Sequence, residues 1–192
     1  MPEVKTVYPE GMAKQSKVIV PEIGDRLCGA HSPGHFDGVA TVVTKLFNMV
    51  MPDIAVFGEK DYQQLLLIKK LVHDLNMPIK IIGAPTHREQ SGLAMSSRNQ
   101  YLSEAEQIVA SEIYQTLLDI KQSLENGRND FTTLCEQAKQ AIEQKGFEVD
   151  YIEICRETDL MPAQSSDKGL RILVAAQLGL ARLIDNLPCN LA

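Results

Sequence analysis

The spacing of apolar residues predicts a strand–helix–strand unit in the first half of the chain. After Pro33-Gly34, apolar residues recur at the spacing of one helical face, at Val39, Val42, Val43, Leu46, Phe47 and Val50. The apolar run at residues 54–57, which ends at Gly58, predicts a buried strand of a parallel sheet. A second helix is expected at about residues 61–75, followed by a strand at residues 79–82. Together these elements form a βαβ unit.

The second half of the chain has a different pattern, which predicts helices followed by strands. Ser103 and Glu106 have the spacing of a capping box, so we expect a helix to begin there and to run to about residue 125. A further helix is expected from about residue 130 to Gly146, a glycine that suits a left-handed cap. Strands are expected at residues 147–155, 171–176 and 180–184, the last two forming a hairpin.

The change of pattern near residues 90–100 indicates two domains, which we place at residues 1–92 and 93–192. The first is α/β, with helices around a parallel sheet, and the second is a small α+β domain. Residues 1–33 are rich in Pro and Gly, and the short apolar run Val18-Ile19-Val20 is a candidate strand.

Composition and charge narrow the classes of partner. An apolar fraction of 44% in 192 residues is ordinary for a globular chain. The net charge of −6, without a basic arm, argues against nucleic acid or an anionic membrane as the main partner. Residues 1–5 lack the apolar region of a signal peptide, and no apolar stretch approaches the length of a membrane span. We expect a cytoplasmic protein that binds small molecules.

The cysteines and histidines give no metal-site signal. Cys28, Cys135, Cys155 and Cys189 form no CxxC pair and have no zinc-ligand spacing. We interpret them as reduced structural thiols in a reducing compartment. His31 and His35 are four residues apart, but Pro33-Gly34 interrupts the helix that such a metal pair needs. No metal-binding residue is therefore expected.

The first candidate site is Phe57-Gly58-Glu59-Lys60-Asp61, between the predicted strand and the second helix. Ligands of open α/β sheets bind beyond the carboxyl ends of the strands. Gly58 permits close approach of a ligand, the helix start offers N–H groups to an anion, and Lys60 adds a charge suited to phosphate. Asp61 would cap the helix or accept from a ribose hydroxyl. On residue types alone, a merely solvated turn is the more common case.

Two further segments carry candidate chemistry. Met95-Ser96-Ser97-Arg98 offers two hydroxyls and a guanidinium that suit a polyphosphate, although a polar linker with helix-capping serines has the same residues. Gln63-Gln64 can donate and accept hydrogen bonds, which suits a substrate with hydroxyl and carboxylate groups. Two solvated amides on an exposed helix face are an equally good interpretation.

An ordered series of motifs begins at Tyr8-Pro9 and spans the chain. The motifs are Pro33-Gly34-His35-Phe36, Lys45-Leu46-Phe47-Asn48, Pro52-Asp53-Ile54-Ala55, residues 57–64, residues 92–102 and Ala181-Arg182-Leu183-Ile184-Asp185-Asn186. In this order they resemble the pantoate–β-alanine ligase (pantothenate synthetase) family of the HIGH-motif nucleotidylyltransferase superfamily. The resemblance implies a partial Rossmann-like parallel sheet in the first domain and the family's lid in the second.

The resemblance also implies an activity. Pantoate would attack the α-phosphorus of ATP to give pantoyl adenylate and pyrophosphate, and β-alanine would then displace AMP to make pantothenate for coenzyme A biosynthesis. Mg²⁺ would accompany the nucleotide phosphates. The expected assembly is a homodimer, with no nucleic acid or membrane as partner.

By the same resemblance, one group of site residues follows the first strand. Gly58 and Asp61 would hold the ribose of ATP, and Glu59 would lie beside them in the nucleotide site. Lys60 would bind the phosphates and is an expected catalytic residue. Gln64 would bind pantoate.

A second group lies after the βαβ unit. Met95, Ser96, Ser97 and Arg98 match the family's triphosphate clamp, and Ser96, Ser97 and Arg98 are expected catalytic residues. The backbone of His87 would meet the adenine.

Two departures from the family pattern affect these expectations. The family's N-terminal third is absent, and with it the histidine motif that stabilises the departing pyrophosphate and one of two pantoate-binding glutamines. Ser32 stands where the family has arginine, and Cys28 where it often has glutamate. We expect the isolated chain to have very low activity. We also expect it either to associate through the surface exposed by the missing strands or to keep a well-folded C-terminal domain beside a less stable half domain. The alternative function is a non-catalytic nucleotide-binding or interaction module derived from the same family.

Overall fold

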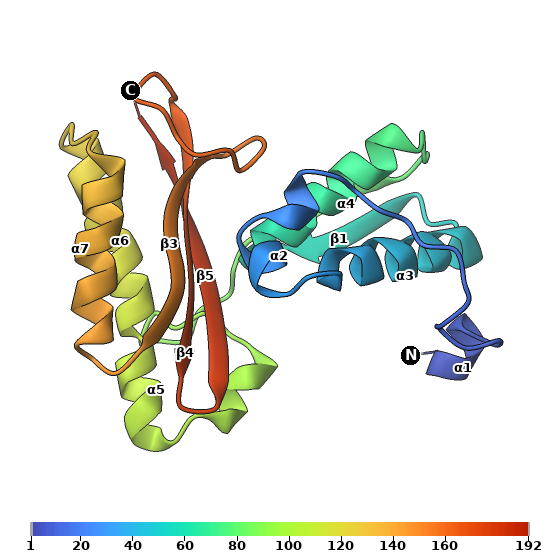
Figure 1. The fold of residues 1–192 in the computed structure, drawn as a ribbon, viewed down its shortest axis with the longest axis horizontal. Coiled ribbons are helices and arrows are strands. Elements are labelled where there is room, and N and C mark those ends of the chain that lie inside the picture. The colour runs from blue at the N-terminus through green and yellow to red at the C-terminus, as the bar shows by residue number, and fades with distance from the viewer. Residues whose placement is uncertain (1, 192) are drawn as a thin grey trace. The chain divides into compact units, whose positions relative to one another are not determined.

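The computed structural model describes residues 2–191, and the chain divides into two compact units that meet between Ala84 and Pro85 (Figure 1). This division lies N-terminal to the expected boundary at 92/93, because residues 85–92 pack with the second unit. The assignment of a nucleotide-binding part and a lid stays a prediction.

The first unit contains a parallel βαβ arrangement preceded by helices. Its elements are α1 (Val4–Val7), η1 (Ile23–Asp25), α2 (Cys28–His31), α3 (His35–Val50), β1 (Ile54–Gly58), η2 (Glu59–Asp61), α4 (Tyr62–Asp74) and β2 (Lys80–Ala84). β1 and β2 pair in parallel, in register from Ile54 opposite Lys80 to Gly58 opposite Ala84. The expected strand–helix–strand order is confirmed.

One face of this two-stranded sheet packs against helices α3 and α4. Phe36, Ala40 and Phe47 of α3 form a core with Leu67, Ile68, Leu71 and Val72 of α4. Ala55 and Phe57 of β1, Ile81 of β2 and Ile79 directly before β2 pack against this core. The alternation of side chains along each strand therefore turns Ala55 and Phe57 toward the helices.

The other face of the β1–β2 sheet is exposed. Ile54 is 53% exposed, Val56 is 63% exposed and Ile82 is 38% exposed. Parallel sheets are normally covered on both faces, so this apolar face is unusual for the fold. The expectation that missing strands of the family leave such a surface exposed stays a prediction.

The expectation of a strand at Val18-Ile19-Val20 is wrong, since these residues have no regular secondary structure. Val20 is buried in the α3–α4 core, and the backbone N–H of Val18 donates to the hydroxyl of Thr41 at 2.9 Å. The run is apolar because it covers helix α3 and not because it pairs with a strand.

The second unit is a three-stranded antiparallel sheet with helices on one face (Figure 1). Its elements are η3 (Ser97–Tyr101), α5 (Glu104–Ala110), α6 (Glu112–Glu125), α7 (Phe131–Glu143), β3 (Glu148–Arg156), β4 (Gly169–Leu178) and β5 (Ala181–Asn190). The strand order is β3-β4-β5. The expected hairpin is confirmed, with longer strands that turn at Gly179 and Leu180.

Helices α6 and α7 bury one stripe each against this sheet. Leu117, Ile120 and Leu124 of α6 and Leu134 and Ile142 of α7 share a core with the inner side chains of the three strands. The capping box at Ser103 and Glu106 is present, with both reciprocal bonds. The helix expected to run from there to residue 125 is divided at Ser111, whose hydroxyl donates to the carbonyl of Ile108. Such local bonds compete with the helical ladder.

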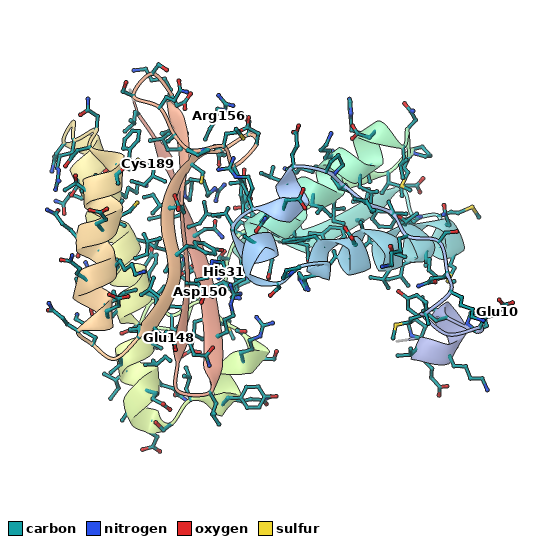
Figure 2. The ribbon with its side chains drawn as sticks, in the orientation of Figure 1. Glu10, His31, Glu148, Asp150, Arg156 and Cys189 are labelled. Atoms are coloured by element: carbon teal, nitrogen blue, oxygen red, sulfur yellow. The ribbon has the colours of Figure 1, made fainter. Side chains whose placement is uncertain are left out.

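None of Cys28, Cys135, Cys155 and Cys189 forms a disulfide. Cys155 and Cys189 are buried in the sheet, and Cys189 lies near the end of β5 (Figure 2). Burial, with a contribution from the charge of Glu153, raises the pKa of the Cys135 thiol to about 12. Burial also raises the pKa of Cys189. Within residues 2–191, no helix is long and apolar enough to cross a membrane.

We predict that the isolated chain self-associates through the exposed face of the β1–β2 sheet. Substituting Val56→Lys adds a charge to this face and should shift the chain toward monomer in sedimentation velocity. Leu180→Lys is the matched control, because Leu180 is also exposed but lies in the turn of the second unit. A stable monomer that unfolds in a single sharp thermal transition would contradict this prediction.

We also predict that Cys135 stays protonated in the folded chain up to about pH 10, well above the ordinary thiol pKa of about 8.5. Since the folded pKa is raised, the thiol's contribution to stability is complete below the unfolded pKa and is lost as pH rises toward 12. Mass-spectrometric mapping of alkylation by iodoacetamide at pH 9 should find Cys135 slow in the folded chain and fast in urea. Equal rates in both states would contradict the assignment.

Candidate functional site

The first group of predicted residues lies where β1 passes through the short helix η2 into α4. Gly58 ends β1 with an extended backbone, and a Cβ added there would meet nothing within 4 Å. The space beside Gly58 is therefore open, and a ligand could approach its exposed backbone. Lys60 is half-buried and Asp61 is exposed. Gly58, Glu59, Lys60 and Asp61 are thus brought together at one strand end, where the sequence placed them.

Asp61 occupies the N-cap position of α4, but its side chain makes no capping bond. The capping bond expected for this carboxylate is therefore absent, and its expected contact with a ribose hydroxyl stays a prediction. Glu59 instead lies against β2, where a Cβ added to Gly83 would come within 3.0 Å of its Oε1. A side chain at position 83 would displace Glu59, so this glycine lets the turn pack on the neighbouring strand.

Gln63 and Gln64 differ in their environments. Gln64 is half-buried at the start of α4, next to the Asp61 turn, as its expected role requires. Gln63 is 5% exposed, and its amide nitrogen donates to the carbonyls of Ile23 at 2.6 Å and Arg26 at 2.7 Å. Its oxygen accepts from the backbone N–H of Cys28 at 3.2 Å.

The segment that Gln63 holds has an irregular backbone. Leu27 has a φ of 48°, and a Cβ added to Gly29 would come within 1.9 Å of the carbonyl oxygen of Gly24. A buried amide that satisfies three backbone groups of this loop has a structural role that sequence reasoning missed. The signal was available, because Gln63 lies four residues before Leu67 on the buried side of α4.

The second group of predicted residues lies on a hairpin and the short helix that follows it. The backbone N–H of Met95 donates to the carbonyl of His87 at 2.9 Å, and Arg88 bridges to Ala94. The backbone position expected to meet adenine is therefore hydrogen-bonded to the first residue of the expected triphosphate clamp. We call residues 87–95 the clamp hairpin.

The serines of the clamp differ in structure. The hydroxyl of Ser96 accepts from the backbone N–H of Arg98 at 3.2 Å and caps η3. Ser97 and Arg98 are exposed, as is Met95. The capping interpretation of the serines therefore holds for Ser96, whose hydroxyl proton is still available to a ligand. Asn99, one residue further on, is buried and its amide donates to Glu89 and to the carbonyl of Ala94.

Two pockets lie away from these residues. One, of about 420 Å³, lies between α7 and β3, and the other, of about 450 Å³, lies beside the end of α4 at Ile79 and Ile81. Neither is lined by a predicted site residue. Among residues 2–191, no cluster of three or more His, Cys, Asp or Glu side chains is placed to hold a metal ion, and this includes His31 and His35.

Comparison with known proteins identifies relatives along nearly the whole chain. A family model described as pantoate-beta-alanine ligase matches residues 1–188. A pantothenate synthetase of Pseudomonas fluorescens strain Pf0-1 is 56% identical over 190 residues, covering 99% of this chain and 66% of the relative. One from Marinobacter nauticus is 54% identical over 186 residues, covering 97% and 66%. The chain thus spans 66% of the length of these relatives.

Solved structures agree with the sequence comparison. Pantothenate synthetase from Thermus thermophilus is 41% identical with a TM-score of 0.90, covering 97% of this chain and 67% of that one. A pantoate-beta-alanine ligase from Francisella tularensis, solved with beta-gamma ATP and beta-alanine, is 35% identical with a TM-score of 0.74, covering 95% and 61%. These neighbours confirm the α/β nucleotidylyltransferase-type fold expected from the sequence. The chain belongs to the pantoate-beta-alanine ligase family.

Proposed function

We propose that this chain is the nucleotide-clamping and lid portion of a ligase that uses ATP to join pantoate to β-alanine. The observation that carries the proposal is the family match over residues 1–188, since it includes every predicted site residue. The activity itself is taken from relatives that are longer than this chain.

The proposed reaction has two steps. A carboxylate oxygen of pantoate attacks the α-phosphorus of ATP, and the bond from that phosphorus to the bridging oxygen of pyrophosphate breaks. The amine of β-alanine then attacks the acyl carbon of pantoyl adenylate and expels AMP, which retains the attacking oxygen, while the amine loses a proton. The products are pantothenate, AMP and pyrophosphate.

The residues of the first unit have properties that suit the nucleotide and pantoate. The helix N-terminus at α4 favours an anion, and the ammonium of Lys60 beside it would neutralise phosphate charge. The exposed carboxylate of Asp61 would accept from a ribose hydroxyl near the accessible backbone of Gly58. Glu59 would support this turn from its position against Gly83. Gln64 would hydrogen-bond to pantoate.

The clamp residues of the second unit would act on the triphosphate. Arg98 is exposed, and its guanidinium would stabilise the charge that builds on the phosphates during the attack. The hydroxyls of Ser96 and Ser97 would donate to phosphate oxygens, Met95 would pack on the nucleotide, and the His87 backbone would contact adenine.

Mg²⁺ is part of the proposal, and the described side chains offer it no cage of carboxylates. Magnesium usually keeps several waters and binds substrate phosphates with one or two carboxylates. It would therefore enter bound to the phosphate oxygens of ATP and lower their charge, without a dedicated protein site. The homodimer expected from the family resemblance belongs to the same proposal.

The chain alone is proposed to be nearly inactive, because the family's pyrophosphate-stabilising histidines are missing from it. We predict that AMP release that depends on pantoate, β-alanine and ATP occurs only in a protein extended by the upstream segment of the relatives. Equal rates for the two proteins would contradict the assigned role of those histidines. Binding of ATP without turnover by both would favour the non-catalytic alternative.

We further predict that Lys60→Ala in the extended protein lowers kcat/KM by about a hundredfold or more, the size expected for loss of one preorganised charge at a phosphoryl centre. Lys69→Ala is the matched control, since Lys69 is an exposed lysine of α4, the helix that follows the η2 turn of Lys60. It should change kcat/KM by less than about twofold, because surface substitutions away from a site have small effects. An equal loss of kcat/KM in both variants would contradict the assignment of Lys60 to the site.

A further inference from the structure

The clamp hairpin closes on itself through backbone hydrogen bonds. The N–H of Glu89 donates to the carbonyl of Leu93, and the N–H of Gly92 donates back to Glu89, both at 2.9 Å. Together with the bond from Met95 to His87, these hydrogen bonds join the two arms of the hairpin. Isolated hairpins are at best marginally stable in water, so its conformation depends on what anchors it.

Arg88 provides the anchor from within the hairpin. Its guanidinium donates to both carboxylate oxygens of Asp185 on β5, at 2.5 and 2.9 Å, and to the carbonyl of Gly92 at 3.1 Å. The same group lies 3.8 Å from the ring centroid of Tyr114 on α6. The side chains of Arg88 and Asp185 are 17% and 3% exposed. One planar cation thus joins the strand, the helix and the tip of the hairpin.

Asp185 is itself held by a buried polar network. Its Oδ1 accepts from the backbone N–H of Asn186 at 2.7 Å. The side chain of Asn186 accepts from Arg171 of β4 at 3.0 Å, and Arg171 also pairs with Glu157 at 2.5 Å. The sequence motif that contains Asp185 and Asn186 thus places a buried carboxylate on β5, next to a residue that is hydrogen-bonded to β4.

The tip of the hairpin is fitted to the helix. Gly92 has a φ of 91°, and a Cβ added there would come within 2.6 Å of the ring of Tyr114. Glycine therefore meets two requirements at once, a left-handed backbone and close approach of the aromatic ring. The ring of Tyr114 therefore lies against both Arg88 and Gly92 of the hairpin.

A bidentate arginine fork restricts orientation as well as distance, which a lysine ammonium does not. Residues held in advance in their binding geometry lose less conformational entropy when a ligand binds. The exposed residues that the anchor holds are those at the ends of the hairpin, His87 and Met95, with Ser96 directly after them.

We infer that Arg88 and Asp185 are positioning residues that hold the clamp hairpin ready for the nucleotide. Neither is assigned contact with ATP. The inference rests on the proposed function, since ATP is taken as the ligand of the clamp. It gives a role to the Asp185–Asn186 motif, which the proposed mechanism does not use.

Hydrogen exchange on the chain itself tests the anchoring. In Arg88→Lys and Asp185→Asn, exchange at the amides of Glu89, Gly92 and Met95 should rise by about tenfold or more relative to the β4–β5 ladder. Asp150→Asn is the matched control, because Asp150 on β3 (labelled in Figure 2) accepts a hydrogen bond from Arg182 of β5, so this variant changes an ion pair of the same sheet. A rise shared equally by hairpin and ladder would mean general destabilisation and would overturn the inference.

ATP dependence in the extended protein tests the consequence. Arg88→Lys should raise KM for ATP by about tenfold and leave KM for pantoate unchanged. The reason is that ATP binding would then have to order the clamp hairpin, which costs conformational entropy. An unchanged KM for ATP in an active variant would overturn the inference and leave the proposed function standing. No ATP dependence in the unmodified extended protein would instead overturn the proposed function, and the nucleotide role of the hairpin with it. Arg88→Lys keeps a positive charge beside Asp185, so it can still be measured if Asp185→Asn fails to fold.

Discussion

The parallel pairing of β1 with β2 is the constraint on which the first unit depends. Parallel strands cannot be joined by a tight turn, so the chain must cross over through α4. That crossover places the end of β1 directly before the N-terminus of a helix, and Gly58, Lys60 and Asp61 occupy the junction. The same pairing leaves one apolar face of the sheet uncovered by residues 2–191. The candidate site and the uncovered face thus both belong to the β1–β2 sheet. The relatives are longer than this chain and have further residues that could cover that face.

In the second unit, the inferred structural role is to fix the conformation of the clamp hairpin. The antiparallel sheet of this unit packs against the α6–α7 core and carries Asp185 and Arg171 as buried charges. Removing one partner of a buried pair costs about 3–5 kcal/mol. Exposed pairs such as Lys70–Asp74 contribute little. Because a buried pair adds little net stability over apolar packing, the orientation it imposes on the hairpin is the better explanation of its presence.

Local features of the fold were predictable from the sequence, and features that depend on distant contacts were not. The βαβ order, the capping box at Ser103 and the β4–β5 hairpin follow from apolar periodicity and turn chemistry within a few residues. The covering role of Val18 and Val20 depends on a hydrogen bond to Thr41, and the unit boundary depends on Arg88 reaching Asp185. The candidate site residues come from motif resemblance and stay predictions. The sequence places Gln63 on the buried side of α4, but its bonds to the loop at residues 23–28, like the bonds of Arg88 to Asp185, are visible only in the structure.

The proposed function requires the ligase reaction to pass through pantoyl adenylate. The most direct measurement uses pantoate whose carboxylate oxygens carry a heavy oxygen isotope, with the extended protein and mass spectrometry of the products. If pantoyl adenylate forms, one heavy oxygen should appear in the phosphate of AMP, because the pantoate oxygen that attacked the α-phosphorus stays on that phosphorus when AMP departs. AMP without the label, or label in pyrophosphate, would contradict the proposed intermediate.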